Sequence, residues 1–205
     1  MQKNNIPKTA IILAGGKGTR LSEQTKLIPK PLVKVGDDSA IFHIIRHFVS
    51  FGVTNIIIPG GYKFDVLVKA FQEKFQIENE SDDNVQIISR RDDLLFKAHI
   101  KLIDTGYTTG TAQRINKALK EVPDSEENVF VTYGDTFSDV NLRKVSDILN
   151  KEKYAAVLTV VPNEERFGIV TLSGSLIRIS EPTRLTRSSY AFFCLTINSN
   201  HTIEL

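Results

Sequence analysis

Glycine and positive charge are concentrated directly after the first apolar stretch of the chain. The segment LAGGKGTRLSEQTKLIPKPL, residues 13–32, holds three glycines, one arginine and three lysines. Glycine has no Cβ, so backbone N–H groups can approach phosphate oxygens closely, while lysine and arginine supply positive charge. The segment therefore predicts a phosphate-binding loop at the end of the first strand.

Two common phosphate-binding motifs do not fit the spacing of this loop. A Walker A loop requires G-x-x-x-x-G-K-[ST], but the sixth position counted from Gly15 or Gly16 is Arg20 or Leu21. A dinucleotide fingerprint G-x-G-x-x-G fits Gly16 and Gly18, but Leu21 stands where the third glycine belongs. Both motifs are excluded.

Further motifs follow in order along the chain: GGYK (60–63), DTGYTTGTAQR (104–114), TYGD (132–135) and RFGIV (166–170). Together with L-A-G-G-x-G-T-R-L and the later P-K-P, they resemble the sugar-1-phosphate nucleotidylyltransferases over nearly the whole chain. The wording GTRLSEQT…PKPL most resembles the glucose-1-phosphate cytidylyltransferases. The resemblance implies a nucleotidyltransferase (glycosyltransferase-A-like) fold. It also implies transfer of a cytidylyl group from CTP to a phosphorylated acceptor, expected to be a sugar 1-phosphate, with release of pyrophosphate.

The resemblance also implies roles for individual residues. The glycine loop wraps the triphosphate, Arg20 holds the departing pyrophosphate, and Lys30 steadies the phosphoryl groups. Asp135 takes the place of a Mg²⁺ ligand, which makes Mg²⁺ the implied cofactor. These roles suit a phosphoryl-type transfer, in which positioning and charge neutralisation carry the rate. The nucleotide-binding residues implied in this way are Leu13, Ala14, Gly15, Gly16, Gly18, Thr19, Arg20, Thr109, Gly110, Thr111 and Arg114.

The choice of base is less sharply defined by the sequence. Arg114 aligns with an arginine that the cytidylyltransferases use against the pyrimidine, which favours CTP. Gly110-Thr111-Ala112 also resembles the G-T-A of thymidylyl- and uridylyltransferases. Cytosine and uracil differ at position 4 as donor and acceptor, and the sequence does not show which way the backbone group facing it points. UTP and dTTP therefore remain alternatives.

The acceptor side departs from the family pattern. Gly134, Gly168, Glu181, Arg184 and Tyr190 are the residues implied to bind the acceptor. The family usually has E-K-P where this chain has SEPTR, so the lysine that meets the sugar phosphate is missing, and Arg184 or Arg187 are its candidate replacements. The family usually places a glycine pair where this chain has Tyr190-Ala191. These differences leave open a smaller, non-sugar phosphate or phosphonate acceptor.

A second departure concerns the metal. The family continues to a second metal-binding aspartate, but the last aspartate in this chain is Asp147. This leaves open a shortened nucleotide-binding relative without full turnover, although we favour the enzyme. His43 and His47, spaced i, i+4, are expected on a helix flank rather than at a metal, because no H-E-x-x-H glutamate accompanies them.

Short β-branched runs alternate with helical patterns, which predicts an α/β fold: a Rossmann-like, mostly parallel sheet flanked by helices, with a β-rich C-terminal part. A helix near residues 145–149 is expected to turn Val145, Ile148 and Leu149 inward, and the polar run 78–84 is expected to be a solvated loop. Ligands in such sheets lie beyond the carboxyl ends of the strands. We therefore expect the loops that carry the motifs to gather at one edge.

Composition limits the remaining possibilities. The chain has 205 residues, is 41% hydrophobic, and has a net charge of +2 with no long basic run, which argues against nucleic acid as a partner. One cysteine allows no internal disulfide and fits a reducing compartment. No stretch reaches the length of a membrane span. We expect a single domain over residues 1–205, shorter than the family at its C-terminus, located in the cytoplasm away from membranes. Its exposed apolar β surface suits a homo-oligomer.

Overall fold

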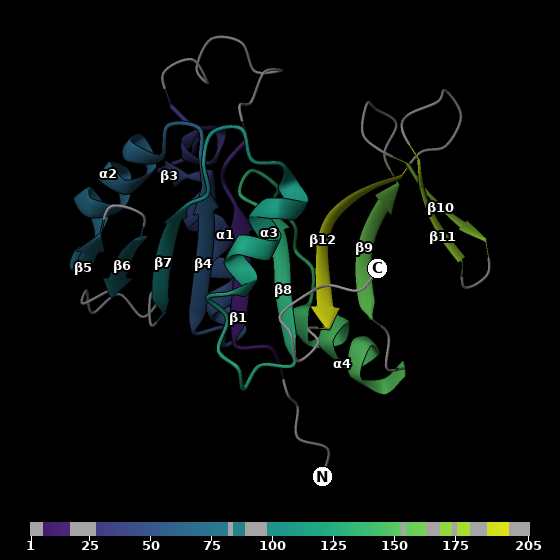
Figure 1. Cartoon of the computed structure of the whole chain (residues 1–205). Helices are drawn as coiled ribbons and strands as arrows, with labels where there is room; N and C mark the ends of the chain where they lie inside the picture. The colour runs from purple at the N-terminus through teal and green to yellow at the C-terminus, as the bar shows by residue number, and fades with distance from the viewer. Residues whose placement is uncertain are drawn as a thin grey trace.

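The centre of the molecule is an eight-stranded sheet in the order β5-β6-β7-β4-β1-β8-β12-β9 (Figure 1). The computed structural model describes residues 6–16, 28–81, 84–88, 98–152, 155–162, 169–173, 176–180 and 188–196. The four central strands, all parallel, are β7 (His99–Asp104), β4 (Asn55–Gly60), β1 (Thr9–Leu13) and β8 (Asn128–Tyr133). The predicted α/β fold with a parallel sheet is therefore confirmed, and the parallel pairing is concentrated in these four strands.

Both sides of the sheet are completed by antiparallel strands. On one side lie β6 (Asn84–Ile88) and β5 (Gln76–Ser81), and on the other β12 (Ser188–Thr196) and β9 (Ala156–Pro162). Two small hairpins stand apart from this sheet, β2 (Lys34–Val35) with β3 (Asp38–Ser39) and β10 (Ile169–Ser173) with β11 (Leu176–Ser180).

The prediction of a solvated loop over residues 78–84 is wrong. Residues 76–81 form β5, which pairs antiparallel with β6 at the edge of the sheet. The error has a physical reason: polar and charged residues are tolerated on edge strands, where backbone pairing forms the strand without an apolar pattern. Asp82 and Asp83 lie outside the described residues.

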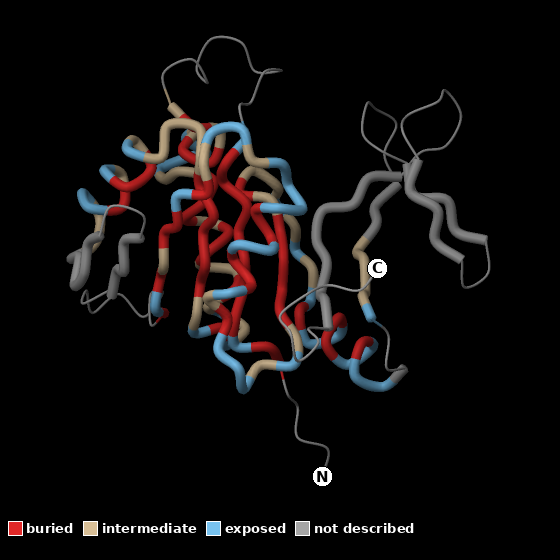
Figure 2. The backbone as a smooth tube through the Cα atoms, viewed as in Figure 1, coloured by how far each residue is buried: buried red, intermediate tan, exposed pale blue. Residues whose placement is uncertain are grey.

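Helices cover both faces of the sheet. The helices α1 (Ala40–Ser50), α2 (Phe64–Lys74) and α4 (Leu142–Glu152) share one apolar core with alternate strand residues such as Ile12, Ile58 and Phe130. The helix α3 (Thr111–Leu119) packs on the other face, in a second core that includes Ile11 and Val131. Figure 2 shows this double burial as continuous red along the central strands. Alternate side chains of one strand thus serve two layers, as expected for a sheet covered on both faces.

Ile148 does not point inward as predicted. It is 48% exposed, whereas Leu142, Val145 and Leu149 of the same helix are buried. At 100° per residue, Ile148 lies about 100° away from the centre of the buried face, so the shorter Ser146 takes the covered position instead. Among the described residues, none of the helices is both long and apolar enough to cross a bilayer.

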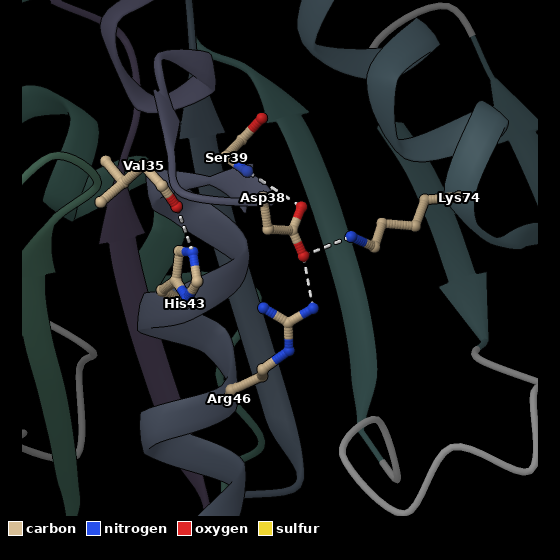
Figure 3. A network of polar contacts seen from close by, with 6 residues as sticks. All are labelled: Val35, Asp38, Ser39, His43, Arg46 and Lys74. Atoms are coloured by element: carbon tan, nitrogen blue, oxygen red, sulfur yellow. Dashed lines mark hydrogen bonds and ion pairs between the residues drawn. The ribbon is translucent and has the colours of Figure 1, made fainter.

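A carboxylate with two cationic partners ties the β2–β3 hairpin to two helices (Figure 3). Asp38 accepts a hydrogen bond from the backbone N–H of Ser39 at 2.9 Å and forms ion pairs with Arg46 on α1 and Lys74 on α2. Burial by itself would raise the pKa of Asp38, but the hydrogen bonds from Lys74 and Arg46 outweigh it, so the pKa lies below its ordinary value. The carboxylate therefore stabilises the fold in its charged form.

Replacing Asp38 with Asn is expected to lower the free energy of unfolding by about 2 kcal/mol at neutral pH, because both cations lose a charged acceptor. The folded-state pKa is depressed, so this contribution is present above the ordinary value of 3.8 and is lost as the pH falls through the folded value. Urea unfolding at pH 7 and at pH 3 measures the contribution of the carboxylate to the free energy of unfolding. Asp37→Asn, at the exposed neighbouring position, is the control. Equal losses in both variants, or a deficit of Asp38→Asn that does not shrink between pH 7 and pH 3, would contradict this account.

Candidate functional site

A cavity of about 610 Å³ opens at the carboxyl ends of the central strands, the upper edge in Figure 1. It is lined by Leu13, Ala14, Gly15, Gly16, Lys30, Pro31, Tyr107, Thr108, Thr109, Gly110, Thr111, Arg114, Tyr133 and Asp135. These residues come from the ends of β1 and β8, from the loop between β7 and α3 with the first turn of α3, and from the short 3₁₀ helix η2 (Lys30–Leu32). The expected gathering of the motif loops at one edge is therefore what the fold produces.

The loop after β1 is held against the neighbouring strands at its start. The backbone N–H of Ala14 donates to the carbonyl of Pro59 on β4 at 3.1 Å, and Gly134 N–H donates to the Leu13 carbonyl at 2.8 Å. Gly15 is buried, and Gly16 is exposed at the cavity. Residues 17–27 lie outside the described part of the chain, so the predictions for Gly18, Thr19 and Arg20 have no structural counterpart here.

Lys30 and Asp135 meet at the cavity wall as an ion pair. Lys30 starts η2 between two prolines, and Asp135 lies two residues beyond β8. Their side chains are 36% and 23% exposed, respectively, so the pair is open to solvent. Gly134 permits the close approach of these segments, since a Cβ there would lie 3.0 Å from both the Leu13 carbonyl oxygen and Cγ of Pro31. The structure thus brings the predicted phosphate-binding lysine and the predicted metal ligand into contact.

Arg114 lies in the first turn of α3 and is only 5% exposed. Its Nη1 donates to the Gly60 carbonyl at 2.5 Å and to the Thr105 hydroxyl, and its Nη2 donates to the Gly106 carbonyl at 3.1 Å. Burial lowers the pKa of the guanidinium from its ordinary value, and the charge of Asp104 opposes this shift. An arginine keeps its charge under such conditions. The guanidinium therefore links the ends of β4 and β7 while also lining the cavity.

The remaining predicted residues divide into two groups. Thr109, Gly110 and Thr111 line the cavity beside Arg114. Gly168, Glu181 and Arg184 lie outside the described residues. Tyr190 belongs to β12, where the structure describes the backbone of the strand but not this side chain. The implied acceptor side is therefore represented only by Gly134.

Some lining residues were not predicted. Tyr107, Thr108, Tyr133 and Pro31 line the cavity, although all four belong to segments whose neighbours were singled out. An available signal was the aromatic character of Tyr107 inside a polar, glycine-containing motif, whereas Tyr133 also packs against the core.

The two histidines lie on α1, as predicted for a helix flank, and each meets a backbone carbonyl. The Nε2 atom of His43 lies 2.9 Å from the Val35 carbonyl oxygen (Figure 3), and that of His47 lies 3.1 Å from the Val140 carbonyl oxygen. Within the described ranges, no cluster of three or more histidine, cysteine, aspartate or glutamate side chains could hold a metal ion.

Comparison with known proteins agrees with the geometry. The family model described as nucleotidyl transferase matches residues 9–191. A glucose-1-phosphate cytidylyltransferase of Salmonella typhi is 32% identical over 173 residues, covering 82% of this chain and 66% of the relative. A D-glycero-alpha-D-manno-heptose 1-phosphate guanylyltransferase of Campylobacter jejuni is 29% identical over 171 residues, covering 83% of this chain and 66% of the relative. The chain thus spans slightly less than two thirds of the length of these two relatives.

Solved structures share the fold of this chain. The crystal structure of HddC from Yersinia pseudotuberculosis matches with a TM-score of 0.66 at 20% identity, covering 92% of this chain and 76% of that protein. At that identity the likeness concerns the fold alone. The family model matches most of the chain, and the curated relatives agree with it, so this chain belongs to the nucleotidyl transferase family, among the sugar-1-phosphate nucleotidylyltransferases.

Proposed function

We propose that the protein transfers a cytidylyl group from CTP to a phosphorylated acceptor, a sugar 1-phosphate, and releases pyrophosphate. An oxygen of the acceptor phosphate attacks the α-phosphorus of CTP, a new P–O bond forms, and the bond to pyrophosphate breaks. The single observation that carries the proposal is the cavity in which Gly15, Gly16, Lys30 and Asp135 meet the loop at Thr109–Arg114. A single cysteine supports a cytoplasmic location.

The division of charge in the cavity supports this reaction. Phosphoryl-type transfer depends on holding the reacting phosphates in line and neutralising the charge that develops on their oxygens. Lys30 provides a movable point charge at the wall, and the exposed Gly16 leaves backbone with no side chain around it at the cavity. Arg20, proposed to hold the departing pyrophosphate, lies in the segment outside the described residues.

We further propose Mg²⁺ as the cofactor, with Asp135 as its protein ligand. The residues fit such an ion: Mg²⁺ is commonly held by one or two carboxylates together with substrate phosphates and water, and among the described residues Asp135 is the carboxylate that lines this cavity. When bound, the ion would neutralise charge on the phosphate oxygens. In the free protein Asp135 is paired with Lys30. If Asp135 bound Mg²⁺ instead, Lys30 would be available to the phosphate oxygens.

For Arg114 we propose a positioning role. Its three hydrogen bonds use three of the five N–H donors of a guanidinium, all toward protein oxygens. The side chain fits in a slot between two glycines. A Cβ on Gly15 would lie 2.6 Å from Nε of Arg114, and a Cβ on Gly61 would lie 2.8 Å from Nη2. Arg114 thereby fixes the loop that follows β7, at Gly106, relative to the glycine loop that follows β1, at Gly15.

CTP as the donor rests on likeness to relatives. The Salmonella typhi relative is a cytidylyltransferase, whereas the Campylobacter jejuni relative is a guanylyltransferase. The higher identity to the first, and the sequence resemblance to its class, support CTP for this chain.

The proposed reaction is tested by measuring pyrophosphate release with Mg²⁺, using CTP, UTP, dTTP, ATP and GTP in turn against a panel of sugar 1-phosphates and smaller phosphates. Release is expected with CTP and a sugar 1-phosphate, because the cavity brings together the residues implied to bind the nucleotide and a lysine suited to phosphate. Calorimetry of CTP binding accompanies the assay. Tight CTP binding with no pyrophosphate release for any pair of nucleotide and acceptor would show that the protein binds nucleotide without turnover.

Asp135→Asn is expected to lower the rate by about 100-fold or more, the scale of losing several kcal/mol of charge stabilisation at the metal. CTP binding should then no longer be tighter with Mg²⁺ than with a chelator. Without Mg²⁺, the variant should bind CTP at least as tightly as the parent, because Lys30 loses its anionic partner. Calorimetry with and without Mg²⁺ measures both effects.

The control for this variant is Asp139→Asn, since Asp139 is exposed and is not among the residues that line the cavity. It should keep the Mg²⁺ dependence of binding. A Mg²⁺ effect that survives Asp135→Asn would place the metal elsewhere.

Gly15→Ala is expected to lower the free energy of unfolding by about 1–3 kcal/mol, because the new methyl group would push the buried guanidinium off its hydrogen-bond acceptors. Gly16→Ala should cost much less, since nothing lies within 4 Å of a Cβ there. Thermal or urea unfolding measures both. On an Arg114→Ala background, Gly15→Ala should add little further loss of stability. Full additivity of the two changes would show that the Arg114 side chain does not pack against Gly15.

A further inference from the structure

Tyr107 is a large aromatic residue that the fold leaves at the cavity without burying it. It lines the cavity, yet it is 52% exposed. We propose that the Tyr107 ring is the platform on which the base of the bound nucleotide stacks. This inference rests on the proposed function and assigns a binding residue within that site.

The backbone directly before Tyr107 is held by several hydrogen bonds. Gly106 has a φ of +90°, its N–H donates to the Asp104 carboxylate at 2.8 Å, and its carbonyl accepts from Arg114. The Thr105 carbonyl accepts from the Lys117 ammonium at 2.9 Å and from the Thr109 hydroxyl. A ring carried on such a loop loses little conformational freedom when a ligand covers it, which is the property of a preorganised binding surface.

A second aromatic ring supports Tyr107. The rings of Tyr62 and Tyr107 have their centroids 6.0 Å apart at 48°, and Tyr62 is not among the residues that line the cavity. The Tyr62 N–H lies 3.4 Å from the carbonyl of Gly15 in the phosphate loop. Lys63, with a left-handed φ of 52°, places its ammonium 5.5 Å from the centroid of the Tyr62 ring. Tyr62 thus braces Tyr107 and connects it to the loop proposed to hold the phosphates.

The position of Tyr107 relative to the charged wall suits an extended nucleotide. Tyr107 follows β7, and Asp135 follows β8, with β4 and β1 between them. Three strand spacings of about 4.8 Å separate these ends by roughly 14 Å. The charged pair Lys30–Asp135 thus stands at one end of the cavity, beside a Tyr133 ring that packs partly into the core, and the exposed ring of Tyr107 stands at the other end. A ligand with an ionic end and a flat aromatic end matches this division.

Stacking does not choose between bases, because every base has a π face. Tyr107 therefore supplies affinity shared by all nucleotides, and discrimination falls to groups that face the base edge, such as the backbone at Thr109–Thr111. Removing the ring should weaken the binding of every nucleotide that the protein accepts.

The test is calorimetry on the full chain with Tyr107→Ala, Tyr107→Phe and, as a control, Ile148→Ala. Ile148 is exposed to a similar degree, 48%, but lies on α4 away from the cavity lining. The probes are the nucleoside triphosphate that binds most tightly among five, and inorganic tripolyphosphate, which has no base. Tyr107→Ala should weaken nucleotide binding by about tenfold or more, the loss typical of removing an aromatic stacking partner. Tripolyphosphate binding should not change.

Tyr107→Phe should bind both probes as the parent does, because it keeps the ring, and Ile148→Ala should also match the parent. In turnover, Tyr107→Ala should raise KM for the nucleotide and leave kcat nearly unchanged. Unchanged nucleotide affinity in Tyr107→Ala, or an equal loss for tripolyphosphate, would overturn the stacking role while leaving the proposed function in place. A parent protein that binds no nucleoside triphosphate would overturn both.

Discussion

Backbone hydrogen bonds hold β7, β4, β1 and β8 parallel in that order, and so direct four carboxyl ends to one edge of the sheet. β4, β1 and β8 are covered on both faces, which favours near-continuous apolar sequence and concentrates polar groups at the strand ends, whereas β7 carries Lys101 in an ion pair with Glu121. The polar and glycine-rich segments are therefore displaced to the loops at that edge. The cavity results from this arrangement, because its walls are the first residues beyond each apolar run.

Within the cavity, charge is handled in two different ways. Lys30 and Asp135 neutralise each other in a contact that is open to solvent and can be exchanged for other partners. Arg114 is buried and is met by carbonyl and hydroxyl oxygens rather than by a carboxylate in direct contact. Neutral acceptors satisfy its hydrogen bonds without cancelling its charge. A buried cation held in this way keeps the floor of the cavity favourable for an anion, while the exchangeable pair supplies movable charge near the rim.

The family relationship and the structure address different questions. Relatives with similar identity and coverage use different bases, cytidylyl in one case and guanylyl in another, although the shared fold spans them. A fold of this kind is a scaffold on which local groups determine the substrate. In this chain residues 107–111 of one short loop line the cavity, and the two residues before them are held from the following helix, because Arg114 donates to the Gly106 carbonyl and Lys117 to the Thr105 carbonyl.

The sequence by itself determined the α/β class, the central strands and the loops that carry the polar motifs, because buried strands and phosphate-type loops have distinct local composition. It also placed Lys30 and Asp135 on segments that come together. Tertiary structure alone decided three things. The polar residues 76–81 became an edge strand because backbone pairing does not require an apolar pattern. Ile148 turned outward because the angle of α4 on its neighbours selects the buried face. The third is which polar groups meet: Lys30 pairs with Asp135, and Arg114 donates to backbone carbonyls. These contacts depend on which loops come together in space, and residue spacing along the chain does not encode that.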